Sequence, residues 1–180
     1  MTRADEHGRL PPRVVLVGFM GAGKTTVARA LARLMDDSVI DLDDHIISNE
    51  GRTPQALIDE EGEEYFREAE TRALRCVFEN ATARVIATGG GAWTLGRNRA
   101  LIEEHGCLTV WLDAPFDLCW QRTRTQDNQR PFARDEAKAR ELYAQRRAAY
   151  ALASLRINVR VDSTPEQLAR EIEHALLRTD

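Results

Sequence analysis

The chain has 180 residues, of which 43% are apolar and 30% are charged, and its formal net charge is −4. This length and apolar content predict one globular domain with a single core, and they exclude disordered and fibrous classes. No apolar run approaches the roughly 18–20 residues of a membrane span, and no signal peptide is recognisable. We therefore expect a cytoplasmic protein without a membrane partner. Because the charge balance is slightly acidic, we also expect no nucleic-acid partner.

The predicted elements alternate between strands and helices along the chain. Residues 1–12 are polar and are expected to form a disordered lead-in, while residues 13–180 form the domain. Short apolar runs typical of buried parallel strands occupy Arg13–Val17, Val39–Leu42, Arg84–Thr88, Cys107–Leu112 and Arg156–Val161. Helical patterns occupy Thr25–Met35, the segment around Pro54–Glu60, Glu63–Glu79, Leu95–Glu104, Phe116–Arg122, Asp135–Tyr150 and Pro165–Leu177. This alternation predicts a three-layer α/β/α fold with a five-stranded, mainly parallel sheet.

The cysteines and histidines are too scattered for a zinc site. Cys76, Cys107 and Cys119 are widely spaced, and no two of them have the separation of metal-ligand pairs. We interpret them as reduced thiols that pack as small apolar side chains.

A glycine-rich segment joins the first predicted strand to the first predicted helix. Its sequence GFMGAGKTT, at residues 18–26, matches the pattern G-x-x-x-x-G-K-[ST]. Glycines let backbone amides turn toward phosphate oxygens, and the dipole of the following helix attracts the same anions. Lys24, one of only two lysines in the chain, would bridge the β- and γ-phosphates, and the Thr25 hydroxyl would ligate Mg²⁺. The predicted ATP-binding residues are Gly21, Ala22, Gly23, Lys24, Thr25 and Thr26; a glycine turn that merely packs is the alternative.

Two carboxylates follow the second predicted strand. Asp41 and Asp43 are two residues apart, so on a strand they would point to the same face and would need a counter-charge. Mg²⁺ and substrate hydroxyls are natural partners at the carboxyl edge of an open α/β sheet. The alternative interpretation is that Asp43 caps a following helix.

Three further features are candidates for binding an acceptor. Gly89–Gly91 follow the third predicted strand and would expose amides to a ligand. Arg67 and Glu70 are i, i+3 neighbours on a long helix, a pattern that also occurs in solvated surface pairs. Arg146 lies on the inward stripe of a later helix and suits an anion such as a carboxylate, but Arg147 occupies nearly the same sector. Spacing alone does not choose between these two arginines.

The segment Gln121–Asp135 is polar and carries four arginines. Arg122, Arg124, Arg130 and Arg134 would suit either a lid that closes over an anion or an ordinary solvated loop.

Taken in order from Arg13 to Leu177, these motifs resemble the shikimate kinase family. The resemblance rests on the GFMGAGKTT loop, the DLD pair, GRT at Gly51–Thr53, FRxxE around Arg67, the glycines Gly89–Gly91, Arg130-Pro131, and an arginine shortly before Tyr150. It implies a P-loop fold like that of nucleoside-monophosphate kinases, with a lid at about residues 123–135, in a monomer. It also implies transfer of the ATP γ-phosphoryl to the 3-hydroxyl of shikimate, in the pathway to chorismate and aromatic amino acids.

The resemblance also implies roles for single residues on the acceptor side. Asp43 would hold the shikimate hydroxyls and assist their deprotonation. Arg67 and Arg146 would bind the shikimate carboxylate, and the amides of Gly89–Gly91, that of Gly90 above all, would complete the substrate site.

On the phosphate side, the resemblance places Mg²⁺ beside Thr25 and Asp41, in part through water. Arg130 would be a lid residue that reaches the phosphates of ATP. Lys24, Asp43 and Arg130 would then form the catalytic set, because phosphoryl transfer requires mainly positioning and charge neutralisation.

Two departures from the family pattern concern the adenine contact. The position seven residues before Arg130 is Thr123, flanked by Arg122 and Arg124, where relatives often carry an arginine. The turn Asp162–Pro165, which would supply the second contact, is short. The rival interpretations are a gluconate-type or other small-molecule P-loop kinase, and a kinase-like sensor that binds its ligand without turnover.

Overall fold

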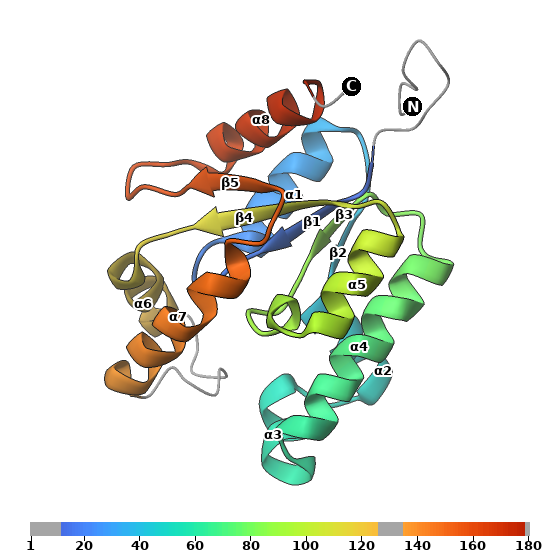
Figure 1. The fold of residues 1–180 in the computed structure, drawn as a ribbon, viewed down its shortest axis with the longest axis vertical. Coiled ribbons are helices and arrows are strands. Elements are labelled where there is room, and N and C mark those ends of the chain that lie inside the picture. The colour runs from blue at the N-terminus through green and yellow to red at the C-terminus, as the bar shows by residue number, and fades with distance from the viewer. Residues whose placement is uncertain (1–11, 126–134, 179–180) are drawn as a thin grey trace.

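A computed structural model describes residues 12–125 and 135–178 of the chain, and it contains one five-stranded sheet (Figure 1). The strands are β1 (Val14–Val17), β2 (Val39–Asp41), β3 (Val85–Ala87), β4 (Leu108–Asp113) and β5 (Leu155–Asn158). Every pairing is parallel, and the order across the sheet is β2-β3-β1-β4-β5. The predicted α/β architecture is therefore confirmed.

The burial of the strands follows their place in the sheet. All four side chains of β1, the central strand, are completely buried, as its continuous apolar sequence predicts for a strand covered on both faces. On the edge strand β5, Ile157 is buried whereas Arg156 and Asn158 are exposed. The register aligns Val15 with Ile86 on one side and with Thr109 on the other, so the carboxyl ends of the strands meet at one edge.

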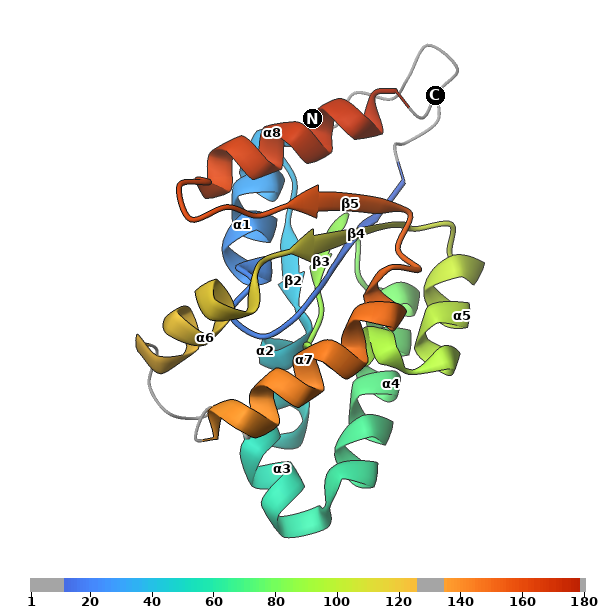
Figure 2. The same cartoon turned by 60° about the vertical axis from the view of Figure 1, so that its left-hand side comes forward.

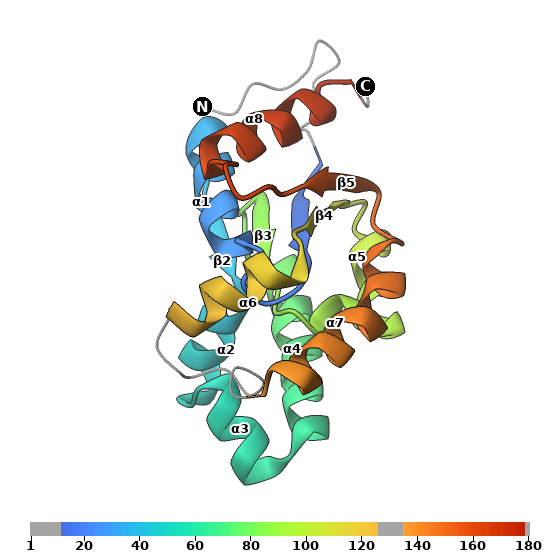
Figure 3. The same cartoon turned by 90° about the vertical axis from the view of Figure 1, so that its left-hand side faces the viewer.

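Helices cover both faces of the sheet. They are α1 (Lys24–Leu34), α2 (Leu42–Glu50), α3 (Pro54–Glu61), α4 (Glu63–Asn80), the short 3₁₀ helix η1 (Ala92–Thr94), α5 (Gly96–Glu104), α6 (Phe116–Thr125), α7 (Glu136–Tyr150) and α8 (Pro165–Leu176). Helices α1 and α8 pack on one face, and α4, α5 and α7 lie on the other (Figure 3). Right-handed crossovers between parallel strands require this division.

Helices α2 and α3 and the start of α4 extend past the carboxyl edge of the sheet (Figure 2). Local sequence explains where α3 begins: Thr53 is its N-cap and accepts a hydrogen bond from the Ala56 amide, and Pro54 takes the first helical position. The resulting helical arm lies beside the loops that follow β1, β2 and β3, where ligands bind in open α/β sheets.

The ends of several predicted elements differ from the structure. The third strand is shorter than predicted, at Val85–Ala87, and the fourth is shifted by one residue, to Leu108–Asp113. Helix α6 continues to Thr125, so the first residues of the segment predicted as a lid are helical. The second strand ends at Asp41 instead of Leu42, because Asp41 caps a helix, α2, for which we predicted no range. The fifth strand ends at Asn158 instead of Val161, because the chain turns there: the Arg160 amide donates to Ser163 Oγ at 2.9 Å. Most of the predicted lead-in and the predicted lid core at residues 126–134 lie outside the described residues. Within the described ranges, no helix combines the length and apolar character needed to cross a bilayer.

Candidate active site

Two cavities open at the carboxyl edge of the sheet, and they share two residues. The first, of about 340 Å³, is lined by the phosphate loop and reaches Asp43 and Gly90. The second, of about 260 Å³, lies between the helical arm and α7 and also includes Asp43 and Gly90. The described part of the chain therefore has a phosphate-loop cavity and an acceptor cavity that meet at one carboxylate.

The loop at residues 18–26 has the backbone that anion binding requires. Gly21 and Gly23 have φ angles of +75° and +98°, which L side chains rarely adopt, and α1 begins directly after Gly23. A side chain at Gly21 would also collide with the Cys119 carbonyl oxygen. The Lys24 ammonium is buried and donates to the carbonyls of Gly18 and Phe19 at 2.8 and 2.9 Å. It thus lies over the loop in which phosphates would bind.

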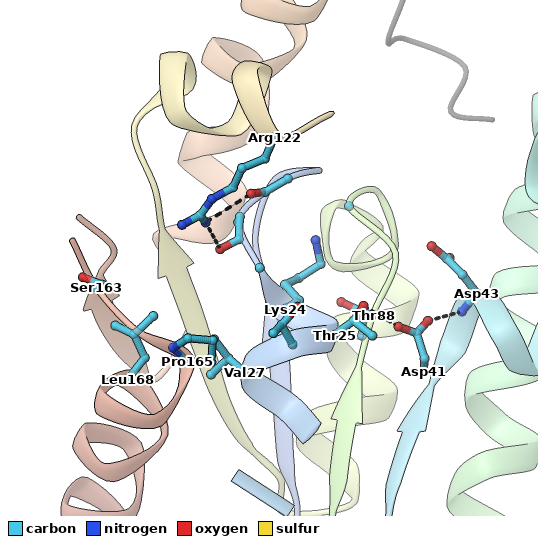
Figure 4. A pocket seen from close by; sticks show the side chains of 15 residues that line it. Lys24, Thr25, Val27, Asp41, Asp43, Thr88, Arg122, Ser163, Pro165 and Leu168 are labelled. Atoms are coloured by element: carbon cyan, nitrogen blue, oxygen red, sulfur yellow. Dashed lines mark hydrogen bonds between the residues drawn. The ribbon is translucent and has the colours of Figure 1, made fainter. Parts of the chain in front are cut away.

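Asp41 and Asp43 have different structural tasks. Asp41 Oδ2 accepts a 2.5 Å hydrogen bond from the Thr25 hydroxyl, and its Oδ1 accepts one from the Asp43 amide at 3.0 Å. Asp41 is therefore the N-cap of α2, and the alternative in which Asp43 is the cap is wrong. The expectation of two carboxylates on one strand face is also wrong, because Asp43 already belongs to the first turn of α2. That turn directs the Asp43 carboxylate toward the phosphate-loop cavity (Figure 4), at the place where this cavity meets the acceptor cavity.

The far end of the phosphate-loop cavity is lined by Ser163, Pro165 and Leu168, with Lys24 between this end and Asp43 (Figure 4). Arg122 lines the same cavity, and its Nη1 lies 3.4 Å from the Ala22 carbonyl. Arg124 instead borders a separate hollow beside Trp120. Of the two arginines that flank Thr123, the structure brings Arg122 to the cavity. Thr123 itself is buried, and its hydroxyl donates to the Cys119 carbonyl at 2.8 Å.

In the acceptor cavity, Arg67 is held by two glutamates of its own helix. Its guanidinium donates to Glu70 at 2.5 Å and to Glu63 at 2.9 Å. Burial alone lowers the pKa of Arg67, but these carboxylates outweigh burial and raise the pKa above its ordinary value. Glu70 is completely buried, and burial raises its pKa, with Arg67 acting in the opposite direction. The predicted i, i+3 pair is therefore a buried pair that orients Arg67, not a solvated one.

Arg146, and not Arg147, reaches the acceptor cavity from α7. Arg146 is 9% exposed and lines the cavity with Arg67 and Gly90. Burial lowers its pKa, an effect that the neighbouring Tyr150 partly opposes, so this guanidinium gains from an anionic partner. The Tyr150 hydroxyl donates to the Gly90 carbonyl at 2.5 Å and ties α7 to the glycine loop.

Gly89 and Gly91, in the loop after β3, make room for side chains of the site. A Cβ at Gly89 would lie 2.8 Å from both Asp43 Oδ1 and Glu70 Oε1. A Cβ at Gly91 would collide with the Arg67 guanidinium. One at Gly90 would lie 3.3 Å from the Met20 backbone nitrogen and at an ordinary 3.6 Å from Arg146 Nη1. The expected reason for these glycines was close approach of a ligand, and the structure adds close approach of the charged residues.

Comparison with known proteins places these features in a family. The family model described as shikimate kinase matches residues 20–177. A shikimate kinase of Ruegeria pomeroyi is 37% identical over 166 residues, which cover 91% of this chain and 84% of that protein. The chain belongs to the shikimate kinase family. The predictions of a family, of a P-loop fold and of a kinase are confirmed together.

Solved structures agree with membership of the shikimate kinase family. A shikimate kinase from Acinetobacter baumannii, in complex with shikimate, has a TM-score of 0.86 and 35% identity, and the match covers 94% of each chain. A gluconokinase from Sinorhizobium meliloti has a TM-score of 0.63 at 17% identity, so this second likeness shows only a common fold. The gluconokinase, which represents one rival interpretation, thus has the same fold as this chain but little sequence similarity to it.

Sequence reasoning missed the apolar wall of the acceptor cavity. It consists of Met20, Ile47, Pro54, Ile58 and Phe66, which come from the phosphate loop and the helical arm. Ile47 is 38% exposed and lines this cavity. The one available signal was the position of Phe66 beside Arg67. Arg130, the predicted lid arginine, lies outside the described residues.

The oxygen atoms near the phosphate loop suit a hard cation. Across residues 12–125 and 135–178, no three His, Cys, Asp or Glu side chains cluster as a metal site made of protein groups alone. Mg²⁺ in kinases does not need one, because one or two protein oxygens and the nucleotide phosphates hold it. The Thr25 hydroxyl and the Asp41 carboxylate, 2.5 Å apart beside the cavity, are such oxygens.

Proposed function

We propose that this protein transfers the γ-phosphoryl group of ATP to the 3-hydroxyl of shikimate, yielding shikimate 3-phosphate and ADP on the route to chorismate and aromatic amino acids. The observation that carries the proposal is the meeting of the two cavities at Asp43 and Gly90. A phosphate held by the loop and a hydroxyl held by Asp43 would be neighbours, which direct transfer requires.

The acceptor cavity matches the chemistry of shikimate, which has a carboxylate, hydroxyls and an apolar ring. Arg67 and Arg146 line one side and would bind the carboxylate, because arginine binds such groups through two parallel hydrogen bonds. The apolar wall that includes Ile47 and Phe66 would cover the ring. Asp43 and the Gly90 amide would then hold the hydroxyls.

Phosphoryl transfer needs little covalent help from the protein. The 3-hydroxyl oxygen forms a bond to the γ-phosphorus while the bond to the β-phosphate oxygen breaks, and Asp43 accepts the hydroxyl proton. Lys24 and the loop amides would neutralise the charge on the transferring group. Arg130 would add a positive charge, and its assignment rests on the family resemblance alone.

Thr25 and Asp41 would hold Mg²⁺, as their hydrogen-bonded oxygens at the cavity wall support. When bound, Mg²⁺ offsets the negative charge of the β- and γ-phosphates. The nucleotide base would lie at the end formed by Ser163, Pro165 and Leu168, with Arg122 above the phosphate loop.

The test is an assay of ADP release with purified protein, ATP and Mg²⁺ against shikimate, gluconate and each nucleoside monophosphate. We expect turnover with shikimate and little above background with the others. The matched control is Asp43→Asn, which keeps the shape of the side chain but lacks a charge to accept the proton. Faster turnover with gluconate or a nucleotide would contradict the proposal, and binding of shikimate without turnover would favour the sensor interpretation.

We further propose a single-domain monomer that works in the cytoplasm without nucleic-acid or membrane partners. The single sheet supports one domain, and the placement of the whole acceptor site on one chain supports a monomer. The three free cysteines support the cytoplasmic location, where thiols stay reduced. Sedimentation of the active protein checks the oligomeric state.

A further inference from the structure

The adjacent arginines of α7 serve different partners. Arg146 lines the acceptor cavity, whereas Arg147 makes a two-pronged ion pair with Asp113: Nη1 to Oδ1 at 2.7 Å and Nη2 to Oδ2 at 3.2 Å. Arg147 also donates to the Tyr143 hydroxyl at 2.8 Å, and its guanidinium lies 5.0 Å from the centre of the Trp111 ring. The Arg147 side chain is therefore fixed by several contacts beside the acceptor site.

Asp113 offers Arg147 a rigid anchor. It is the last residue of β4, in the sheet, and its side chain is only 7% exposed. Its carbonyl accepts a hydrogen bond from the Val159 amide at 3.0 Å, and its carboxylate also pairs with Arg156 of β5 at 2.5 Å. Asp113 thus belongs to the sheet, whereas Arg147, which it holds, belongs to α7.

Consecutive residues on an α-helix point about 100° apart, so fixing the direction of one side chain fixes that of its neighbour. Near its C-terminal end, α7 is also held by the Tyr150 hydroxyl on the Gly90 carbonyl and by Trp93 Nε1 on the Ala149 carbonyl at 2.8 Å. The pair with Asp113 acts at the position next to Arg146. Because both arginines have the same chemistry, a specific contact is needed to decide which one enters the cavity.

We propose that Asp113 is a positioning residue of the acceptor site: its pair with Arg147 sets the rotation of α7 and so directs Arg146 toward the acceptor carboxylate. This inference rests on the proposed function, since it takes Arg146 as a ligand of that carboxylate. Asp113 touches neither substrate; it acts through α7.

The experiment compares Arg147→Gln and Asp113→Asn with Arg156→Gln as the matched control. Arg156 binds the same carboxylate but lies on β5, so its loss removes an ion pair without releasing α7. For the first two variants we expect the KM for shikimate to rise about three- to tenfold, because part of a charge-assisted contact is lost, with the KM for ATP within twofold of the wild type. Arg147→Lys keeps the positive charge but cannot form two parallel hydrogen bonds, so its KM for shikimate should lie between those of the wild type and Arg147→Gln.

If the pair between Asp113 and Arg147 had only a structural role, the two variants would have a lower melting temperature, but the ratio of the KM for shikimate to the KM for ATP would stay that of the wild type. The proposal is overturned if Arg147→Gln leaves the KM for shikimate unchanged, or if Arg156→Gln raises it as much. Should Asp113→Asn fail to fold, Arg147→Gln decides, because Asp113 then retains Arg156 as its partner. A wild-type protein without activity on shikimate would instead refute the proposed function, and this inference with it.

Discussion

The substitution Gly91→Ala isolates the position of Arg67 from every other feature of the site. The backbone of Gly91 has φ −102° and ψ −19°, which alanine adopts without strain. A Cβ atom there would lie 2.7 Å from Cζ and from Nη2 of Arg67. Because non-bonded heavy atoms prefer separations of about 3.5–4 Å, the guanidinium must retreat by roughly 1 Å.

That retreat has a calculable effect on substrate affinity. The Arg67 guanidinium is held at 2.5 Å by Glu70, so it cannot move without disturbing both this pair and its alignment toward the acceptor. A hydrogen bond to a charged group contributes about 1.5–3 kcal/mol, and its loss raises the KM for shikimate by roughly ten- to a hundredfold. Stability should also fall, because Glu70 is completely buried and loses part of its pairing with Arg67; the about 0.4–1 kcal/mol by which Gly→Ala stabilises through the unfolded state offsets this only in part.

The assay is ADP release with shikimate and ATP varied in turn, together with a thermal melt of each protein. Gly96→Ala is the matched control, because its Cβ would lie at an ordinary 3.6 Å from Arg99 Nη2 and would not come within 4 Å of Arg67. An unchanged KM for shikimate in Gly91→Ala would refute this reasoning, as would an equal rise in the KM for ATP.

Three further outcomes are expected. Lys24→Ala should lower kcat by orders of magnitude and leave the melting temperature close to that of the wild type; near-normal turnover would remove this lysine from the mechanism. Arg67→Lys should raise the KM for shikimate but not that for ATP, since an ammonium cannot form the two-pronged contact; the reverse pattern would mean that the acceptor site is misassigned. Burial raises the pKa of Cys107 and Cys119 to about 11, so at pH 8 both are neutral thiols. Iodoacetamide at pH 8 should therefore label them slowly in the folded protein and quickly in urea, as mass spectrometry would show; equal rates would contradict their burial.

Much of the fold can be predicted because the pattern of apolar residues within a short segment indicates whether that segment is buried. The apolar run of β1 is hydrophobic at every position, as a strand covered on both faces must be, and the structure buries all of it. The phosphate loop is equally local, since its glycines, lysine and threonine lie within nine consecutive residues. Helix α2 was not predicted as an element because its sequence, LDDHIISNE, has little apolar periodicity, and contacts with α3, α4 and β2 stabilise it.

The acceptor site depends on contacts between residues far apart in the chain. The sequence by itself determined that Arg67 would lie beside Glu70 and that an arginine before Tyr150 would face inward. Only the tertiary structure decided that this arginine is Arg146, because the rotation of α7 depends on the pair between Arg147 and Asp113, which lie 34 residues apart in the chain. The same holds for Gly91: its neighbours in sequence give no sign that a guanidinium from α4 packs against it. Helical periodicity restricts the direction of a side chain around the helix axis to a sector of about 100°. Packing against distant elements then selects the direction within that sector.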